Sequence, residues 1–144
     1  MDSFPSLLKI YFQQIEKATF HLAYSYQKIL VLPSSIEQLD TTQLEAWEGF
    51  VSRFNRLSDI FLSKYIRTSV LQADPAFRGS LRDFVEQAEK LALIEDSDTW
   101  MSIRELRNNA THEYLDAELS LVFSKMRDLC PLLLTLKDTL KNKK

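Results

Sequence analysis

Residues that break regular structure are scarce in this chain of 144 residues, which holds 2 glycines and 4 prolines. Hairpin-rich β folds need such residues at their turns, so this scarcity favours an all-α protein. The single cysteine, Cys130, excludes an intramolecular disulfide and is typical of a reducing compartment. No apolar run approaches the roughly 18 residues that a membrane helix requires. Charged Lys9, Glu16 and Lys17 also argue against a signal peptide, so we expect a soluble, cytoplasmic protein without membrane contact.

The chain also lacks a strong excess of charge of either sign. Its formal net charge is −2, which excludes a general polyanion binder, so any nucleic-acid contact must come from a local basic patch. Cys130 lies among leucines, and we interpret it as a small buried hydrophobic residue, not as a nucleophile.

Apolar residues make up 45% of the chain and charged residues 26%, the balance of an ordinary globular protein. Apolar residues recur at steps of three and four, which predicts amphipathic helices. We expect one domain over 1–144, a single up-down bundle of about five helices at 4–30, 42–72, 81–93, 99–113 and 116–139. Thr42 and Glu45 have the spacing of a capping box, Ser80 is a second expected cap, and Pro131 predicts a kink or a split.

The predicted fourth helix carries an unusual density of polar side chains. Trp100, Ile103, Leu106 and Ala110 can face the core. Arg104, Asn108 and His112 are spaced four residues apart and therefore share one face, with Arg107 beside that row. Tyr114 lies seven residues after Arg107, on nearly the same face if the helix extends so far.

Phosphate chemistry suits this set. An arginine fork matches phosphate oxygens, and a histidine can take a proton from a ribose 2′-hydroxyl, so Arg107 and His112 could cleave RNA without a metal. No cluster with metal-ligand spacing occurs, and no serine is spaced to form a triad with His112. The other histidine, His21, falls on the polar face of the first helix, which indicates a solvated surface position. The same residues could also be an ordinary polar helix face, since such faces are common.

The string Arg107-Asn108-Asn109-Ala110-Thr111-His112-Glu113-Tyr114 resembles the motif of HEPN domains: arginine, four residues, histidine, one residue, tyrosine. Those domains are small and all-helical, and they occur widely in prokaryotic toxin–antitoxin and defence systems. The resemblance covers most of the chain, because the long helical hairpin, the shorter third helix and the late motif also agree. The chain is most similar to the HEPN toxins that are paired with a minimal nucleotidyltransferase (MNT).

This resemblance implies a metal-independent endoribonuclease toxin that needs no cofactor and acts as a homodimer. Arg107 and His112 of both protomers would meet in a cleft at the dimer interface, Arg107 binding phosphate and His112 transferring protons. Asn108 would orient the site or the RNA. Tyr114 matches the tyrosine that the partner nucleotidyltransferase, the antitoxin, modifies with AMP. We expect Arg104, Arg107 and their twofold mates to form a basic cleft on an otherwise acidic body.

Two alternatives remain open. The chain could be a non-catalytic subunit that binds a nucleotide or substrate for its nucleotidyltransferase partner. It could also be a helical interaction module, in which the polar helix is only a dimer contact. RNA cleavage and nucleotide binding, each measured on the wild type and on a motif variant, distinguish these readings.

Overall fold

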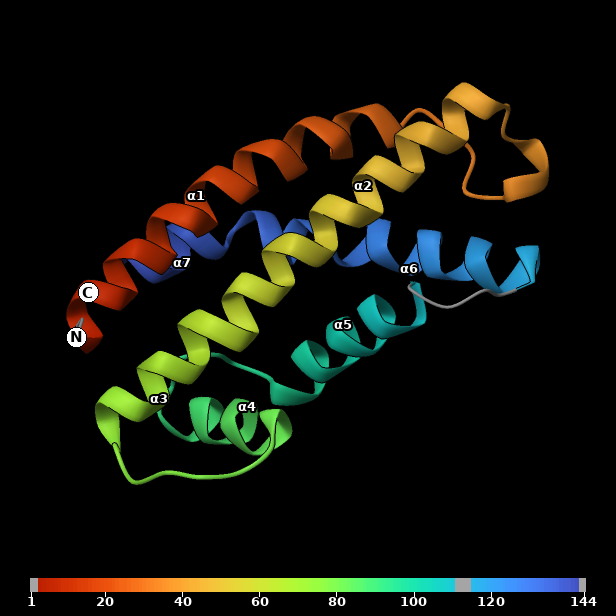
Figure 1. Ribbon diagram of the computed structural model, residues 1–144. Helices are drawn as coiled ribbons and strands as arrows, with labels where there is room; N and C mark the ends of the chain where they lie inside the picture. The colour runs from red at the N-terminus through yellow and green to blue at the C-terminus, as the bar shows by residue number, and fades with distance from the viewer. Residues whose placement is uncertain (1–2, 111–114, 143–144) are drawn as a thin grey trace.

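The computed structural model describes residues 3–110 and 115–142, and this part of the chain is helical, without a β-strand (Figure 1). The expected all-α bundle is therefore confirmed. None of its helices is both long and apolar enough to cross a membrane. In chain order the helices are α1 (Phe4–Ile29), η1 (Ile36–Gln38), α2 (Thr41–Asp59), η2 (Ile60–Ile66), α3 (Arg67–Ala73), α4 (Leu81–Lys90), α5 (Ser97–Ala110), α6 (Asp116–Leu134) and α7 (Leu136–Asn142).

A long antiparallel hairpin forms one side of the bundle. Helix α1 packs along α2, η2 and α3, which follow one another without a break, and α5 and α6 lie behind them (Figure 1). The core between these layers is aromatic: the Trp47 ring stacks on Phe123 at 4.8 Å between ring centroids. The Trp47 indole N–H also donates to the carbonyl of Pro33 at 2.8 Å. This packing fixes α6 against α2.

The start of α2 differs from the prediction. The helix begins at Thr41, and its capping box joins Asp40 to Gln43, not Thr42 to Glu45. The Asp40 carboxylate accepts from the Gln43 N–H at 2.8 Å, and the Gln43 side chain accepts from the Asp40 N–H at 3.0 Å. An aspartate caps a helix as well as threonine does, so two overlapping signals competed and the earlier one prevailed. The second expected cap is confirmed, because Ser80 and Asp83 form the capping box of α4.

The middle of the second long helix contains a π-helical segment, η2, that periodicity did not predict. A π segment widens the helix, because its backbone hydrogen bonds span five residues, and it brings residues five apart closer to one face, whereas an α-helix turns them about 140° apart. The buried residues Phe61, Leu62, Tyr65 and Ile66 lie in this segment. Its widening therefore changes which polar residues face the same side as Asp59, the last residue of α2.

Three further expectations are corrected at helix ends. Helix α4 ends at Lys90, and Leu91, expected to face inward, is 37% exposed beyond that end. The predicted last helix is split in two, as Pro131 suggested, but the break lies at Thr135, where the side-chain hydroxyl donates to the Leu132 carbonyl at 2.9 Å. Leu30 is also exposed, because α1 ends just before it.

Cys130 lies within α6 and is buried among the hydrophobic residues of the core, as its leucine neighbours predicted. Burial raises the pKa of its thiol to about 12, because the interior disfavours the thiolate. A thiol that stays protonated is a poor nucleophile, so Cys130 is part of the core and not of a reactive site.

Candidate functional site

Helix α5 carries the polar stretch and is anchored by three buried residues on one face. Trp100, Ile103 and Leu106 are buried, as the spacing predicted, and the Trp100 ring lies 4.6 Å from the Phe61 ring of η2. The helix begins at Ser97, two residues earlier than predicted. At that end the Asp96 carboxylate accepts from the Asp98 N–H at 3.0 Å. These contacts hold α5 beside the π-helical segment.

Arg107, in the last turn of α5, forms an ion pair with Asp59 across the helix interface. Its Nε donates to Asp59 Oδ2 at 3.1 Å, and its Nη2 lies 3.1 Å from the same oxygen. Both side chains are over a third exposed, at 36% and 37%, so solvent screens the pair. A pair this exposed contributes only about 0–1 kcal/mol of stability. Its structural effect is orientation, because the pair directs the guanidinium towards α2.

A hollow of about 580 Å³ opens beside this ion pair, between α2, η2 and α5. Its charged lining residues are Arg56, Asp59, Lys64, Arg104 and Arg107, and short polar side chains complete most of its wall. Among the residues that the structure describes, four cations against one carboxylate give its lining a formal charge of +3, on a chain whose net charge is −2. We call this feature the cationic hollow. A chain with a slightly negative net charge needs a local basic patch to bind a polyanion, and the cationic hollow is such a patch.

The structure brings together only part of the predicted site. Arg104 and Arg107 both line the cationic hollow. Asn108 is exposed and is not among the residues that line it. His112 and Tyr114 lie outside the described residues. His21 is half-buried and not fully solvated, with its ring 5.7 Å from that of Phe20.

Periodicity missed the contribution of the second helix to this site. Arg56, Asp59 and Ser63 recur at steps of three and four, so the polar face of α2 could have been read from the sequence. Lys64 follows Arg56 by eight residues and so lies near the same face even in an α-helix, and the π segment also brings it closer to Asp59.

Asn55 marks the same wall as unusually polar. Its Oδ1 is buried, and no hydrogen-bond partner for it occurs in the described part of the chain. An unpaired buried acceptor costs about 1–3 kcal/mol. The residue also borders a second hollow, of about 460 Å³, towards the start of α6. Core packing alone does not explain a polar group at this position.

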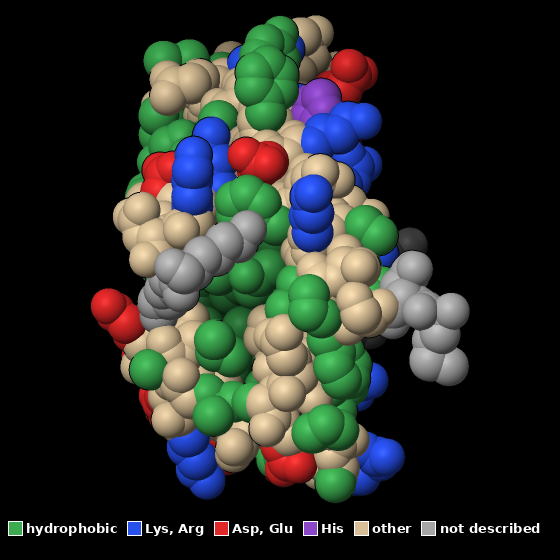
Figure 2. All heavy atoms as spheres, turned by 90° about the vertical axis from the view of Figure 1, so that its left-hand side faces the viewer, with side chains coloured by type: hydrophobic (Ala, Val, Ile, Leu, Met, Phe, Trp, Pro, Cys, Tyr) green, Lys and Arg blue, Asp and Glu red, His purple; other side chains and the backbone are tan. Residues whose placement is uncertain are grey.

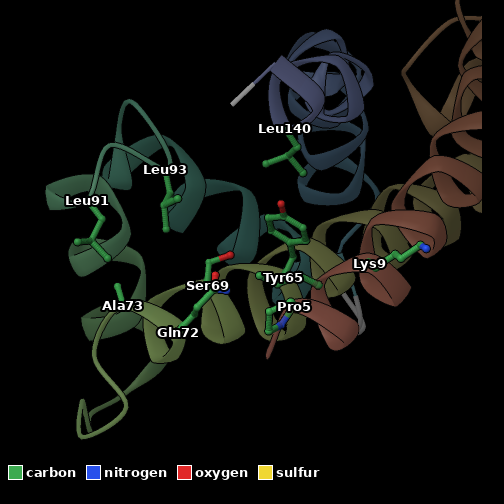
Figure 3. Close-up of a pocket in the computed structure, with 10 residues that line it drawn as sticks. Pro5, Lys9, Tyr65, Ser69, Gln72, Ala73, Leu91, Leu93 and Leu140 are labelled. Atoms are coloured by element: carbon green, nitrogen blue, oxygen red, sulfur yellow. The ribbon is translucent and has the colours of Figure 1, made fainter. Parts of the chain in front are cut away.

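A larger hollow, of about 720 Å³, lies beside the start of α1 and the end of α3 and is mainly apolar. Its walls include Leu8, Leu93 and Leu140, and the Tyr65 hydroxyl points towards Leu140 (Figure 3). Among the described residues that line it, the one cation is Lys9, whose ammonium points away from Tyr65 in that view. Figure 2 shows this end of the molecule, with hydrophobic side chains in the recess. We call it the apolar hollow. Its mainly apolar lining has few groups that could bind an anion.

Comparisons with known proteins add no relative to this picture. No model of a protein family matches the sequence, and searches of curated proteins and of solved structures found no significant match. Within residues 3–110 and 115–142, no group of three or more His, Cys, Asp or Glu side chains is placed to hold a metal ion.

Proposed function

We propose that this chain is a metal-independent endoribonuclease of the HEPN type, the toxin of a pair with an MNT-type nucleotidyltransferase. The observation that carries the proposal is Arg107, the arginine of the motif, at the edge of a hollow lined by three further cations. An arginine with a purely structural role normally uses its N–H groups in hydrogen bonds within the protein. Arg53 is an example: it donates to the His21 carbonyl at 3.1 Å and to Ser25 Oγ at 2.9 Å.

Arg107 differs from Arg53 in what its contacts leave over. Both of its measured contacts go to one oxygen of Asp59. A guanidinium has five N–H groups in a planar fork, so several can still turn to a phosphate. Its charge persists at any working pH, which suits a group that stabilises negative charge on phosphoryl oxygens.

In the proposed reaction, His112 removes the proton from a ribose 2′-hydroxyl, and the 2′-oxygen attacks the adjacent phosphorus. The bond to the 5′-oxygen of the next nucleotide breaks, giving a 2′,3′-cyclic phosphate and a 5′-hydroxyl. Arg107 binds the phosphoryl oxygens, and Asn108 and Arg104 help to hold the RNA. One protomer offers a single motif histidine, so a homodimer supplies the second group needed to protonate the leaving oxygen.

The same proposal explains the tyrosine of the motif. Transfer of AMP to Tyr114 by the nucleotidyltransferase places a bulky anion seven residues from Arg107. A phosphate group there competes for the arginine and reduces the positive field that attracts RNA. The antitoxin thereby holds the nuclease inactive.

The test is a ribonuclease assay in EDTA that compares the wild type with His112→Ala, after intact mass has shown that Tyr114 is unmodified. We expect the wild type to cut RNA and His112→Ala to be inactive. Cleavage by both proteins points to a contaminating nuclease or another site. The absence of cleavage by an unmodified wild-type dimer refutes the nuclease proposal.

A nucleotide-binding subunit is the second candidate, and the size of the cationic hollow favours it. A volume of about 580 Å³ falls within the range of small-ligand sites. This candidate predicts nucleotide binding that Arg107→Ala abolishes, together with a wild type that does not cut RNA. Isothermal titration with ATP, run beside the cleavage assay, separates the two candidates.

A further inference from the structure

We infer that the cationic hollow contains a second phosphate-binding site, formed by Arg56 and Lys64 of the second helix, which binds the RNA backbone next to the phosphate held by Arg107. This inference rests on the proposed function for the identity of the polyanion. Neither residue belongs to the motif, and both come from a part of the chain more than forty positions before it. The ligand is one strand of RNA, recognised through its phosphates.

The first step of the argument concerns which cations are already engaged. Arg53 binds two groups of α1, and the Arg67 guanidinium lies 4.6 Å from the Phe84 ring of α4. Those side chains join helices. Arg56, in contrast, is exposed and lines the hollow. Lys64 is also exposed, and its ammonium is 5.8 Å from the centre of the Tyr11 ring, near the outer limit of a cation–π contact.

The second step concerns Asp59, the one carboxylate among the described residues that line the hollow. Asp59 is paired with Arg107, so its charge is largely offset by that arginine. Arg56, Lys64 and Arg104 remain without a comparable acidic neighbour among the residues that line the hollow. Three like charges around one concave surface raise the free energy of the unliganded protein and attract an anion to the centre.

The third step concerns the π-helical segment. In an α-helix Lys64 would stay near the face of Arg56, eight residues before it, but would be turned about 140° away from Asp59. The π geometry of Ile60–Ile66 brings positions five apart closer to one face, so Lys64 and Asp59 line the same wall. π segments are frequent at functional sites, and here the segment brings Lys64 closer to the ion pair of Asp59 and Arg107.

The fourth step concerns room. About 580 Å³ exceeds what one phosphate needs and is comparable to sites that hold a drug-sized ligand. Consecutive phosphates of one strand can therefore occupy the hollow together. Contacts to phosphate carry no sequence information, so we expect this subsite to bind different sequences equally.

The experiment uses 2′-O-methyl oligoribonucleotides, which lack the attacking hydroxyl and cannot be cleaved by the proposed route. Their length rises from one internal phosphate to four, and affinity is measured by fluorescence anisotropy at several salt concentrations. Wild-type affinity should rise with length. The slope of log affinity against log salt is negative. With the longest oligonucleotide, Arg56→Gln and Lys64→Gln should each make this slope less steep by about 0.7, the value for one lost single-strand contact.

The shortest oligonucleotide should bind both variants as it binds the wild type, since Arg107 and Arg104 of α5 hold its single phosphate. Arg82→Gln, an exposed cation of α4 outside the hollow, is the matched control and should leave every slope unchanged. Circular dichroism confirms that each variant is folded. Slopes in Arg56→Gln and Lys64→Gln equal to those in Arg82→Gln overturn the inference, as does a wild type that binds no oligonucleotide.

Cleavage of unmodified RNA, measured on the same proteins, separates this inference from the proposed function. A wild type that binds with the predicted length and salt dependence but cuts nothing keeps the subsite and refutes the nuclease. A wild type that cuts RNA, with slopes insensitive to Arg56→Gln and Lys64→Gln, keeps the nuclease and overturns the subsite.

Discussion

The apolar hollow and the cationic hollow lie on the same long helix and differ in size and in the chemistry of their lining. The apolar hollow is the larger, at about 720 Å³ against about 580 Å³, and it is lined mainly by aliphatic side chains and one tyrosine. The cationic hollow is smaller and gathers four cations around one carboxylate. Size alone would select the first as the site. Charge favours the cationic hollow, because its four cations offer specific interactions to an anion.

The comparison also separates two uses of the second helix. The Tyr65 side chain is buried in the interior, and this burial raises the pKa of its phenol. One residue earlier, at Lys64, the same π-helical segment faces solvent and the cationic hollow. The following variants test whether function belongs to the charged side of this segment and not to its apolar side.

Arg107→Gln should have the largest effect. Removing one donor that stabilises developing charge typically lowers the rate about 100- to 1000-fold, and we expect RNA cleavage to fall by that amount. Stability should change by less than about 1 kcal/mol, because the ion pair with Asp59 is exposed. Single-turnover cleavage and thermal melting measure the two effects. Cleavage within threefold of the wild type would exclude Arg107 from the chemistry.

Asp59→Asn should have a smaller and opposite effect on binding. The variant removes the only carboxylate among the residues that line the cationic hollow, while the amide can still accept a hydrogen bond from Arg107. We expect uncleavable RNA to bind several-fold more tightly at low salt, with a gain that shrinks as salt screens the charge. Weaker binding in this variant would show that orientation of Arg107 by the carboxylate matters more than its repulsion.

Tyr65→Phe should leave RNA binding and cleavage unchanged, since it alters only the apolar hollow. The phenylalanine keeps the ring that packs on Phe61 at 6.2 Å between centroids. Affinity and rate within twofold of the wild type are expected. A large loss of either one would contradict the assignment of function to the cationic hollow.

The same variant has a small effect on stability in alkali. Because burial raises the pKa of Tyr65 above 10.0, the folded state keeps its proton after the unfolded state has lost it. Stability from this group is full below pH 10.0 and is lost as pH rises through the folded value. Denaturant titrations between pH 9 and 11 should therefore show a steeper loss for the wild type than for Tyr65→Phe. Equal losses would show that the phenol is not protected.

Much of the fold was predictable from apolar spacing, and the exceptions have local causes. The core faces of α1, α2 and α5 follow steps of three and four, and Ile15, Trp47 and Ile103 on these faces are fully buried. The start of α2 was not predicted correctly, because Asp40 and Thr42 are both good caps. The break at Thr135 depends on a side-chain hydrogen bond that spacing does not encode.

The candidate site was predicted only on the α5 side. Arg107 is the arginine of the motif, Arg104 shares a helix face with Asn108, and both arginines line one hollow. Periodicity could also have shown the polar face that carries Asp59, but the ion pair of Asp59 with Arg107 depends on how two helices meet, which a single helical period does not describe. The roles proposed for His112 and Tyr114 remain predictions from the motif.

The most direct test of the central claim is the chemistry of the cut ends. RNA is incubated in EDTA with wild-type protein whose Tyr114 is unmodified, and the product ends are identified by mass spectrometry. Attack by the 2′-oxygen predicts a 2′,3′-cyclic phosphate on one fragment and a 5′-hydroxyl on the other, both absent with Arg107→Gln. Products that end in a 3′-hydroxyl and a 5′-phosphate, or no products at all, would contradict the account.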